Sequence, residues 1–125
     1  MRKSPRCEGQ AGCRGLPPDI LDAMDKVEQF VSGMDLETFS GDVKTHFAVF
    51  RALEIVGEAT KYVPPAVRRR HPAIPWKRMA GMRDRLIHGY FGVDFEIVWE
   101  TAMRLVPELR PQIAAVLEAE RQRRR

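Results

Sequence analysis

Apolar residues recur at helical spacing in separate stretches of the chain, and the first stretch follows a pair of prolines. Side chains three or four positions apart lie on the same face of a helix. The residues that share this first face are Ile20, Met24, Val27 and Val31. Asp19 directly follows Pro17-Pro18, where an aspartate can cap the first turn, and Gly33 suits the position after the last turn. The pattern predicts a helix that starts at Asp19 and ends before Gly33.

A longer apolar stretch predicts a second helix over residues 42–63, after a connection at 34–41 with one short turn at 36–39. The residues of its wide apolar face are Val43, Phe47, Phe50, Leu53 and Val56. Pro64-Pro65 stops this helix, because proline cannot donate a backbone hydrogen bond. A short helix over 65–71 can follow, since proline is tolerated in a first turn.

The third predicted helix starts near Pro75-Trp76 and ends at Gly89, a suitable residue for the position after the last turn. Its inward stripe consists of Met79, Met82 and Leu86. Asp94 is placed to cap a further helix, which Pro107 should break or kink before a terminal helix. No alternation of apolar and polar residues competes with these patterns, so we predict an all-α protein, an up-and-down antiparallel bundle of four to five helices.

The length of 125 residues favours one domain. We expect a disordered segment at 1–16, a helical-bundle domain at 17–120 and a basic tail at 121–125. No apolar run approaches the ~18 residues that span a bilayer. The first 16 residues lack the apolar stretch of a signal peptide. We therefore expect a cytoplasmic protein that does not contact a membrane.

The net charge of +4 suits a polyanionic partner but is modest, and much of it lies near the two ends of the chain. A terminal run of arginines is more often a solvated tail than a binding site. The sequence contains no Gly-rich phosphate loop, no nucleophile elbow and no His-Glu-x-x-His. No cofactor or metal ion is predicted.

Arg83 and His88 are the side chains best suited to chemistry on a phosphodiester. Histidine can move a proton near pH 7, and arginine offers a permanently charged fork for phosphoryl oxygens. Asp84 and His88 are i, i+4 neighbours on the third helix and can meet directly. The pair Arg83 and His88 is not specific by itself, because an exposed arginine and a histidine at a helix end also occur for structural reasons.

Four blocks of sequence together resemble the HepT-like proteins of the HEPN class. They are MRDRLIHGYFGVD (residues 82–94), LEIVGEA (53–59), IPW (74–76) and IVWE (97–100). The similarity spans about residues 19–118. It implies a helical bundle that forms a homodimer or a higher even oligomer. It also implies a metal-independent endoribonuclease that acts on RNA as the toxin of a toxin–antitoxin pair, with a minimal nucleotidyltransferase as the antitoxin.

The resemblance assigns roles to individual residues. Arg83 would bind phosphate, His88 would be the acid/base, and Tyr90 would receive AMP from the antitoxin. Asp84 holds a polar position that is often asparagine in relatives. Two departures are the Pro17-Pro18 break in the first helix and Ala52, where relatives often carry asparagine.

Further charged residues are placed less firmly. Arg51, Glu54 and Glu58 share one face of the second helix, where Arg51 and Glu58 would be auxiliary active-site residues unless the stripe is an ordinary charged surface. Of the other histidines, His46 should lie at the edge of the core and His71 should be solvated.

Two other functions stay open. A non-catalytic HEPN module would bind a nucleotidyltransferase partner or a nucleotide, although the intact Arg83, His88 and Tyr90 set favours the enzyme. A basic DNA-binding protein would depend on residues 121–125, but no recognition-helix signature is present.

Overall fold

The computed structural model describes residues 17–87 and 92–123, and within these ranges it is built of helices. In chain order the elements are α1 (Asp19–Val31), α2 (Leu36–Ser40), α3 (Val43–Lys61), α4 (Pro65–Arg70), α5 (Trp76–Ala80), α6 (Met82–Leu86), α7 (Phe95–Glu100), the π-helical turn η4 (Thr101–Leu105) and α8 (Val106–Arg123). In the described part of the chain, β-type pairing is limited to one isolated bridge between Ile87 and Val93. The predicted all-α class is confirmed. The predicted disordered segment 1–16 lies outside the described residues.

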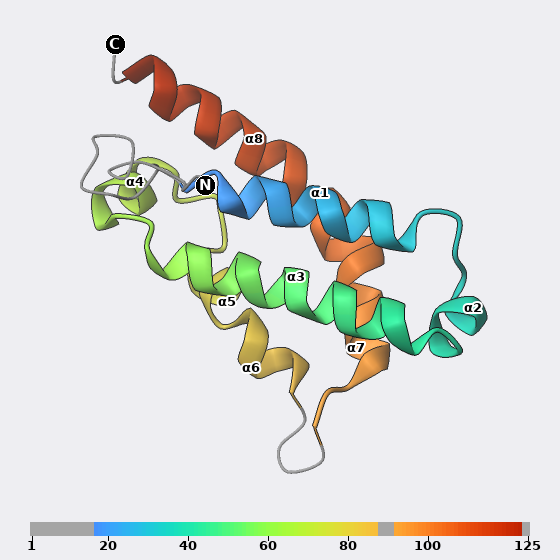
Figure 1. The fold of residues 1–125 in the computed structure, drawn as a ribbon. Helices are drawn as coiled ribbons and strands as arrows, with labels where there is room; N and C mark the ends of the chain where they lie inside the picture. The colour runs from blue at the N-terminus through green and yellow to red at the C-terminus, as the bar shows by residue number, and fades with distance from the viewer. Residues whose placement is uncertain (1–16, 88–91, 124–125) are drawn as a thin grey trace, which may run out of the picture.

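The centre of the fold is the antiparallel pair α1 and α3, which Figure 1 shows running side by side. Helix α8 packs on α1, and α5 and α6 pack on α3. Fully buried side chains from all these helices form one core, to which α1 contributes Met24, α3 Leu53 and α8 Ile113. The position of α6 is therefore set by its packing on α3.

The two ends of α1 agree with the sequence pattern only in part. Helix α1 begins at Asp19, but the N-cap position is held by Pro18, which makes no side-chain capping bond. Asp19 thus lies in the first turn, where its negative charge interacts favourably with the positive end of the helix dipole. At the other end, Gly33 has a φ of +78°, the left-handed conformation expected after a C-cap.

Aspartates cap three later helices. The Asp94 side chain accepts hydrogen bonds from the backbone N–H of Glu96 and Ile97, as predicted. The hydroxyl and backbone N–H of Thr38 donate to Asp35 and lower the pKa of its carboxyl. Asp42 caps α3 in the same way, and the backbone N–H of Thr45 lowers its pKa.

The predicted third helix is wrong in its extent, because the chain forms two short helices there. Gly81 separates α5 from α6, and α6 ends at Leu86. Ile87 is extended, with a φ of −95° and a ψ of 125°. The Leu86 carbonyl accepts a hydrogen bond of 2.8 Å from the backbone N–H of Asp94. In a longer helix this carbonyl would accept from the next helical turn, so the segment at Asp94 replaces that turn. The predicted cap at Gly89 lies outside the described residues.

The apolar face predicted for α3 is also wrong at its amino-terminal end. Val49, Leu53 and Val56 are fully buried, but Val43 and Phe47 are each 60% exposed. The core side of α3 therefore begins about one turn later than the apolar pattern suggests. The first turns of α3 therefore carry a partly exposed apolar surface, on which the Phe47 ring makes an edge-on contact with Phe95.

The predicted disturbance at Pro107 takes the form of a π-helical turn. Pro107 is the second residue of α8, where its missing N–H costs little, and η4 directly precedes this helix. Figure 1 shows the chain changing direction between α7 and α8. Helix α8 then continues through Pro111 to Arg123.

Candidate active site

Arg83 of α6 lies against α3 and is held there by a carboxylate that the sequence motif does not contain. Its Nε donates a hydrogen bond of 2.8 Å to Oε2 of Glu54. The Glu54 side chain is only 17% exposed, whereas that of Arg83 is 50% exposed. The guanidinium is therefore fixed at its Nε and open to solvent beyond it.

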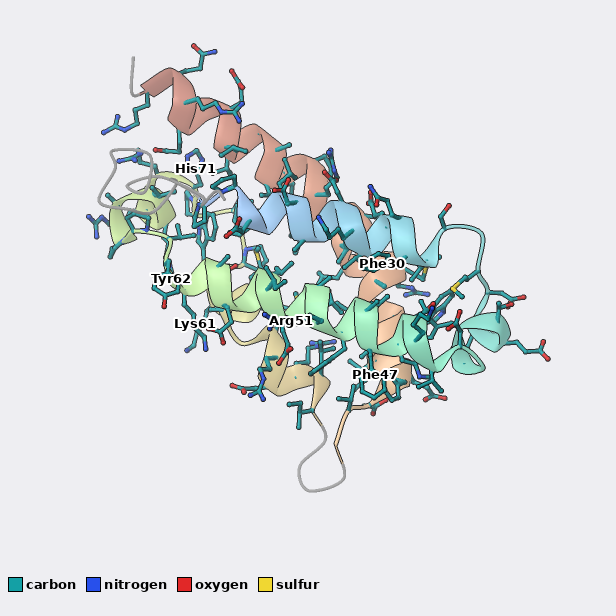
Figure 2. All side chains as sticks on the ribbon, viewed as in Figure 1. Phe30, Phe47, Arg51, Lys61, Tyr62 and His71 are labelled. Carbon is teal, nitrogen blue, oxygen red and sulfur yellow. The ribbon has the colours of Figure 1, made fainter. Side chains whose placement is uncertain are left out.

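Arg51 shares the same carboxylate from the side of α3. Its Nη1 lies 3.5 Å from Oε1 of Glu54, and its side chain is 69% exposed. Figure 2 shows Arg51 on the part of α3 that lies beside α6. One carboxylate thus serves two guanidinium groups, which leaves a formal charge of +1 on the cluster. Such a cluster attracts an anion, and a fork with free N–H groups suits phosphoryl oxygens.

The Arg83 fork keeps hydrogen-bonding capacity for a ligand. An arginine has five N–H donors, and the Glu54 bond uses the one on Nε. Within the described part of the chain, no residue accepts a hydrogen bond from either Nη of Arg83. The geometry can therefore bind a phosphate through the two Nη groups while Glu54 fixes the rest of the side chain.

The other predicted auxiliary residues do not join this cluster. Glu58 is 54% exposed and lies 3.6 Å from Nζ of Lys61, which fits a surface charge pair on α3. Asp84 is exposed on α6 and forms no ion pair with a described residue. The structure thus brings together Arg83, Arg51 and Glu54.

The predicted meeting of Asp84 and His88 depended on a helix that continues to His88. Because α6 ends at Leu86, the predicted helix through His88 is wrong, whereas the contact of the two side chains stays a prediction. His88 and Tyr90 themselves lie outside the described residues. The two ends of their connection are fixed, since Ile87 pairs with Val93 in the isolated bridge.

Glu54 is the functional residue that sequence reasoning ranked too low. It lies 29 positions from Arg83, so no local spacing connects the two residues. The only signals were its place in the LEIVGEA block and its position three residues after Arg51. The contact arises from the packing of α6 on α3.

A second polar cluster surrounds Glu120 of α8 and contradicts the prediction that His71 is solvated. Arg70 contacts both carboxylate oxygens of Glu120, at 2.6 and 3.1 Å, and Nε2 of His71 lies 2.8 Å from Oε2. The Glu120 side chain is 5% exposed. The Arg70 hydrogen bonds, followed by that of His71, lower the pKa of Glu120 to about 2. Figure 2 labels His71 between α8 and α4.

This cluster is structural, because Arg70 and His71 both bind Glu120 and thereby fix α8 to the carboxyl end of α4. The carbonyl of His71 also accepts a hydrogen bond of 2.9 Å from the buried Trp76 indole. His46, by contrast, lies where it was predicted, at the edge of the core. Its ring packs between Phe39 and Phe95, with centroid distances of 4.7 and 4.2 Å.

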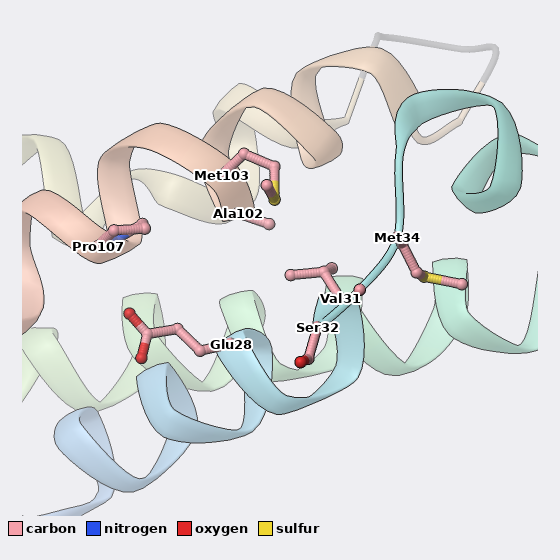
Figure 3. A pocket seen from close by; sticks show the side chains of 8 residues that line it. Glu28, Val31, Ser32, Met34, Ala102, Met103 and Pro107 are labelled. Atoms are coloured by element: carbon pink, nitrogen blue, oxygen red, sulfur yellow. The ribbon is translucent and has the colours of Figure 1, made fainter.

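Three further observations concern the rest of the described chain. A hollow of about 270 Å³ lies between the end of α1 and the η4–α8 junction (Figure 3), and none of the predicted site residues lines it. Within residues 17–87 and 92–123, no three His, Cys, Asp or Glu side chains group to hold a metal ion. No helix in the same part of the chain is long and apolar enough to cross a membrane.

The helical bundle, with the Arg83 motif leading into the α6–α7 connection, defines a protein of the HEPN-like class. Comparison with known families is more specific. Residues 20–116 match the family described as "Ribonuclease HepT-like", and the chain belongs to this family.

Its relatives carry ribonuclease names. The chain is 50% identical over 92 residues to "Probable ribonuclease HepT" of Thermococcus cleftensis, covering 74% of this chain and 84% of the relative. It is 45% identical over 100 residues to a "Putative RNase" of Methanocaldococcus jannaschii, covering 80% and 86%. A "Putative RNase" of Caldanaerobacter subterraneus is 43% identical over 102 residues, covering 82% and 91%. No solved structure gives a significant match to the chain.

Proposed function

We propose that this chain is a metal-independent endoribonuclease of the cytoplasm, in which Arg83 binds the scissile phosphate and His88 transfers protons. The observation that carries the proposal is the arrangement of Arg83, fixed at Nε by the half-buried Glu54 and open at both Nη groups. Membership in the HepT-like ribonuclease family supports RNA as the substrate. Arg51 strengthens the positive potential at the same place. Asp84 and Glu58 stay proposed auxiliary residues, although neither forms an ion pair with this cluster.

The proposed reaction is an internal transesterification. The ribose 2′-oxygen attacks phosphorus as an imidazole takes its proton, and the bond from phosphorus to the 5′-oxygen breaks as an imidazolium protonates that oxygen. The products are a 2′,3′-cyclic phosphate and a 5′-hydroxyl. The guanidinium of Arg83 stabilises the negative charge that builds on the phosphoryl oxygens.

We propose that two copies of the chain form the active unit, as a homodimer or within a higher even oligomer. The reaction needs one group to accept a proton and another to donate one, and each chain has one His88. A two-fold axis would bring two sets of Arg83 and His88 to one cleft. The exposed Val43 and Phe47 lie on α3, the helix that carries Arg51 and Glu54. An exposed apolar surface next to the site supports the docking of a second copy there.

We further propose that the protein is the toxin of a toxin–antitoxin pair, whose antitoxin is a minimal nucleotidyltransferase that transfers AMP to Tyr90. Tyr90 is two residues from His88 in the sequence. An adenylyl phosphate on this side chain would compete for the same guanidinium that binds the substrate phosphate. The modification would therefore silence the enzyme by occupying its phosphate site.

The test of the ribonuclease is cleavage of RNA by the purified full chain in EDTA. We expect cleavage that leaves 2′,3′-cyclic phosphate ends, identified by mass spectrometry of the products. A variant with both Arg83→Ala and His88→Ala, purified in parallel, detects contaminating nucleases. If unmodified wild-type protein cleaves no RNA, the chain is a binding module and the proposed enzyme is wrong.

The test of the silencing step is co-expression with a minimal nucleotidyltransferase encoded beside the gene. We expect wild-type protein to gain the mass of one or more AMP groups and to lose RNA cleavage, while Tyr90→Phe stays unmodified and active. Intact-protein mass spectrometry and the cleavage assay measure both effects. Modification of Tyr90→Phe at wild-type stoichiometry would contradict Tyr90 as the acceptor.

A further inference from the structure

A second group of arginines lines a hollow that the Arg83 site does not include. Arg78 of α5, Arg85 of α6 and Arg104 of η4 come from three separate elements and surround a space of about 270 Å³. Glu100, Thr101 and Glu108 complete most of its wall. The sequence gives no reason to expect this group, because its arginines are up to 26 positions apart and only Arg85 lies in one of the four blocks.

The three arginines of this hollow are exposed, and unlike Arg70 and Arg110 they make few contacts with other residues of the protein. Arg70 and Arg110 each bind a carboxylate at 2.6 Å. Arg78 and Arg85 form no ion pair or hydrogen bond with any residue that the structure describes. Arg104 lies 4.0 Å from Glu100, and both side chains are mostly exposed, at 80% and 63%. Their donors are therefore available to a ligand.

The charge and chemistry of the wall indicate which ligand fits. Three guanidinium groups and two carboxylates give the hollow a formal charge of +1, which complements the single negative charge of a phosphodiester. The Thr101 hydroxyl already donates to the carbonyl of Ile97 at 2.7 Å, so the arginines are the donors. A phosphodiester between two nucleosides meets these conditions, since guanidinium forks match phosphoryl oxygens.

The lining of the hollow does not suit a base or a larger organic ligand. Pockets for small organic molecules usually measure about 300–1,000 Å³ and are mostly apolar. This space is smaller, and five of the seven residues that line it are charged. No aromatic side chain of the described chain lines it, so a base has no ring to stack on. The ligand is therefore a backbone phosphate and not a nucleobase.

The position of Arg85 connects this hollow to the proposed site of cleavage. Arg83 and Arg85 are two residues apart on the same five-residue helix. Two helical steps rotate a side chain by about 200°, so the two arginines leave α6 on nearly opposite sides. A polynucleotide that crosses α6 can contact Arg83 with one phosphate and the hollow with another.

We infer that Arg78, Arg85 and Arg104 form a binding site for a backbone phosphodiester of the RNA substrate, at a nucleotide away from the scissile bond. The inference rests on the proposed ribonuclease function. The site binds the substrate equally before and during cleavage, because the phosphate that it holds does not react. Its loss should therefore raise KM and leave kcat nearly unchanged.

The experiment measures binding of the full chain to a 2′-O-methyl oligoribonucleotide, which cannot be cleaved by attack of its own 2′-oxygen. Fluorescence anisotropy at several salt concentrations gives Kd and its salt dependence for the wild type and for a variant with Arg78→Gln and Arg85→Gln. We expect this variant to bind about tenfold more weakly and to lose about 0.7 from the slope of log K against log salt, the value of one single-strand phosphate. On cleavable RNA, KM should rise by a similar factor.

A charge-matched control separates a local site from general attraction. A variant with Arg121→Gln and Arg123→Gln removes the same charge from the end of α8 and should retain wild-type binding. A third variant with Arg78→Lys and Arg85→Lys should recover most of the salt slope, because the charge is restored. Circular dichroism melts confirm that all the variants are folded.

The outcomes distinguish this inference from the proposed function. Wild-type binding and salt slope in the Arg78 and Arg85 glutamine variant, together with normal RNA cleavage, would overturn the inference and leave the ribonuclease intact. An equal loss in the Arg121 and Arg123 control would also overturn it, since the effect would then be general. If the wild type neither binds nor cleaves RNA, both proposals fail.

Discussion

Replacing Arg83 with alanine is expected to lower kcat/KM for RNA cleavage by about 10²–10³-fold, the usual effect of removing one donor that stabilises transition-state charge. The two Nη groups of Arg83 donate no hydrogen bond to any described residue, so they can bind the phosphoryl oxygens. The hydrogen bond from Nε to Glu54 holds the guanidinium in place. Arg83→Lys should recover only a small part of the activity, because an ammonium cannot form the same two parallel hydrogen bonds. The measurement is the initial rate of cleavage over a range of RNA concentrations.

The effect of His88→Ala should be as large, about 10²–10⁴-fold, since a positioned acid/base contributes that much to proton transfer.

Glu54→Gln keeps the shape of the side chain and weakens its hold on Arg83, so we expect a smaller loss of about tenfold in kcat/KM. Arg69→Ala removes an exposed arginine from α4 and is the matched control, with wild-type rates expected. Normal cleavage by folded Arg83→Ala would contradict the role of Arg83.

The sequence predicted the helices well where each depends on its own residues. Asp94 caps α7 and Gly33 follows α1 as expected, because capping and left-handed glycines are local properties. The end of α6 at Leu86 was missed because there the backbone N–H of Asp94 donates to the carbonyl of Leu86, and a continuous helix would not bring these two residues together. Where a helix ends can thus be decided by a distant segment.

In the candidate site, too, the sequence predicted the local feature and missed the contact between distant segments. The motif itself identified Arg83, but the contact with Glu54 depends on how α6 packs on α3, which no spacing in the sequence reports. Gly57 of α3 contributes to that packing, since a Cβ on this residue would lie 3.5 Å from Cβ of Met82 in α6 and 3.3 Å from the carbonyl oxygen of Met79 in α5. Relations between residues far apart in the chain needed the structure.

Glu120 is a second example of a long-range contact, and this contact affects the stability of the fold and not the proposed reaction. It lies 50 positions from Arg70, yet its carboxylate binds both Arg70 and His71 and is nearly sealed from solvent. Breaking a buried ion pair by removing one partner is strongly destabilising, because the other charge stays buried without compensation. The attachment of α8 to the α4–α5 segment should therefore depend on the charge of this one side chain.

Glu120→Gln is expected to lower the free energy of unfolding at pH 7 by about 3 kcal/mol, the value that corresponds to a pKa lowered from 4.5 to about 2. Because the folded protein favours the ionised carboxylate, this stabilisation is complete above about pH 4.5 and is lost as the pH falls toward 2. The difference between the wild type and Glu120→Gln should therefore shrink over that range, even though other carboxylates titrate in both proteins.

The measurement is denaturant unfolding of both proteins at pH 7 and at steps down to pH 2, followed by circular dichroism. Glu118→Gln is the matched control, because Glu118 is 57% exposed and its pair with Arg121 at 3.5 Å should contribute less than about 1 kcal/mol. Equal stability of the wild type and Glu120→Gln at pH 7 would contradict the proposed role of Glu120. A difference that persists unchanged at pH 2 would show that the lost stability comes from packing of the side chain and not from its charge, since pH 2 is near the folded-state pKa and most of the charge-dependent stabilisation is then lost.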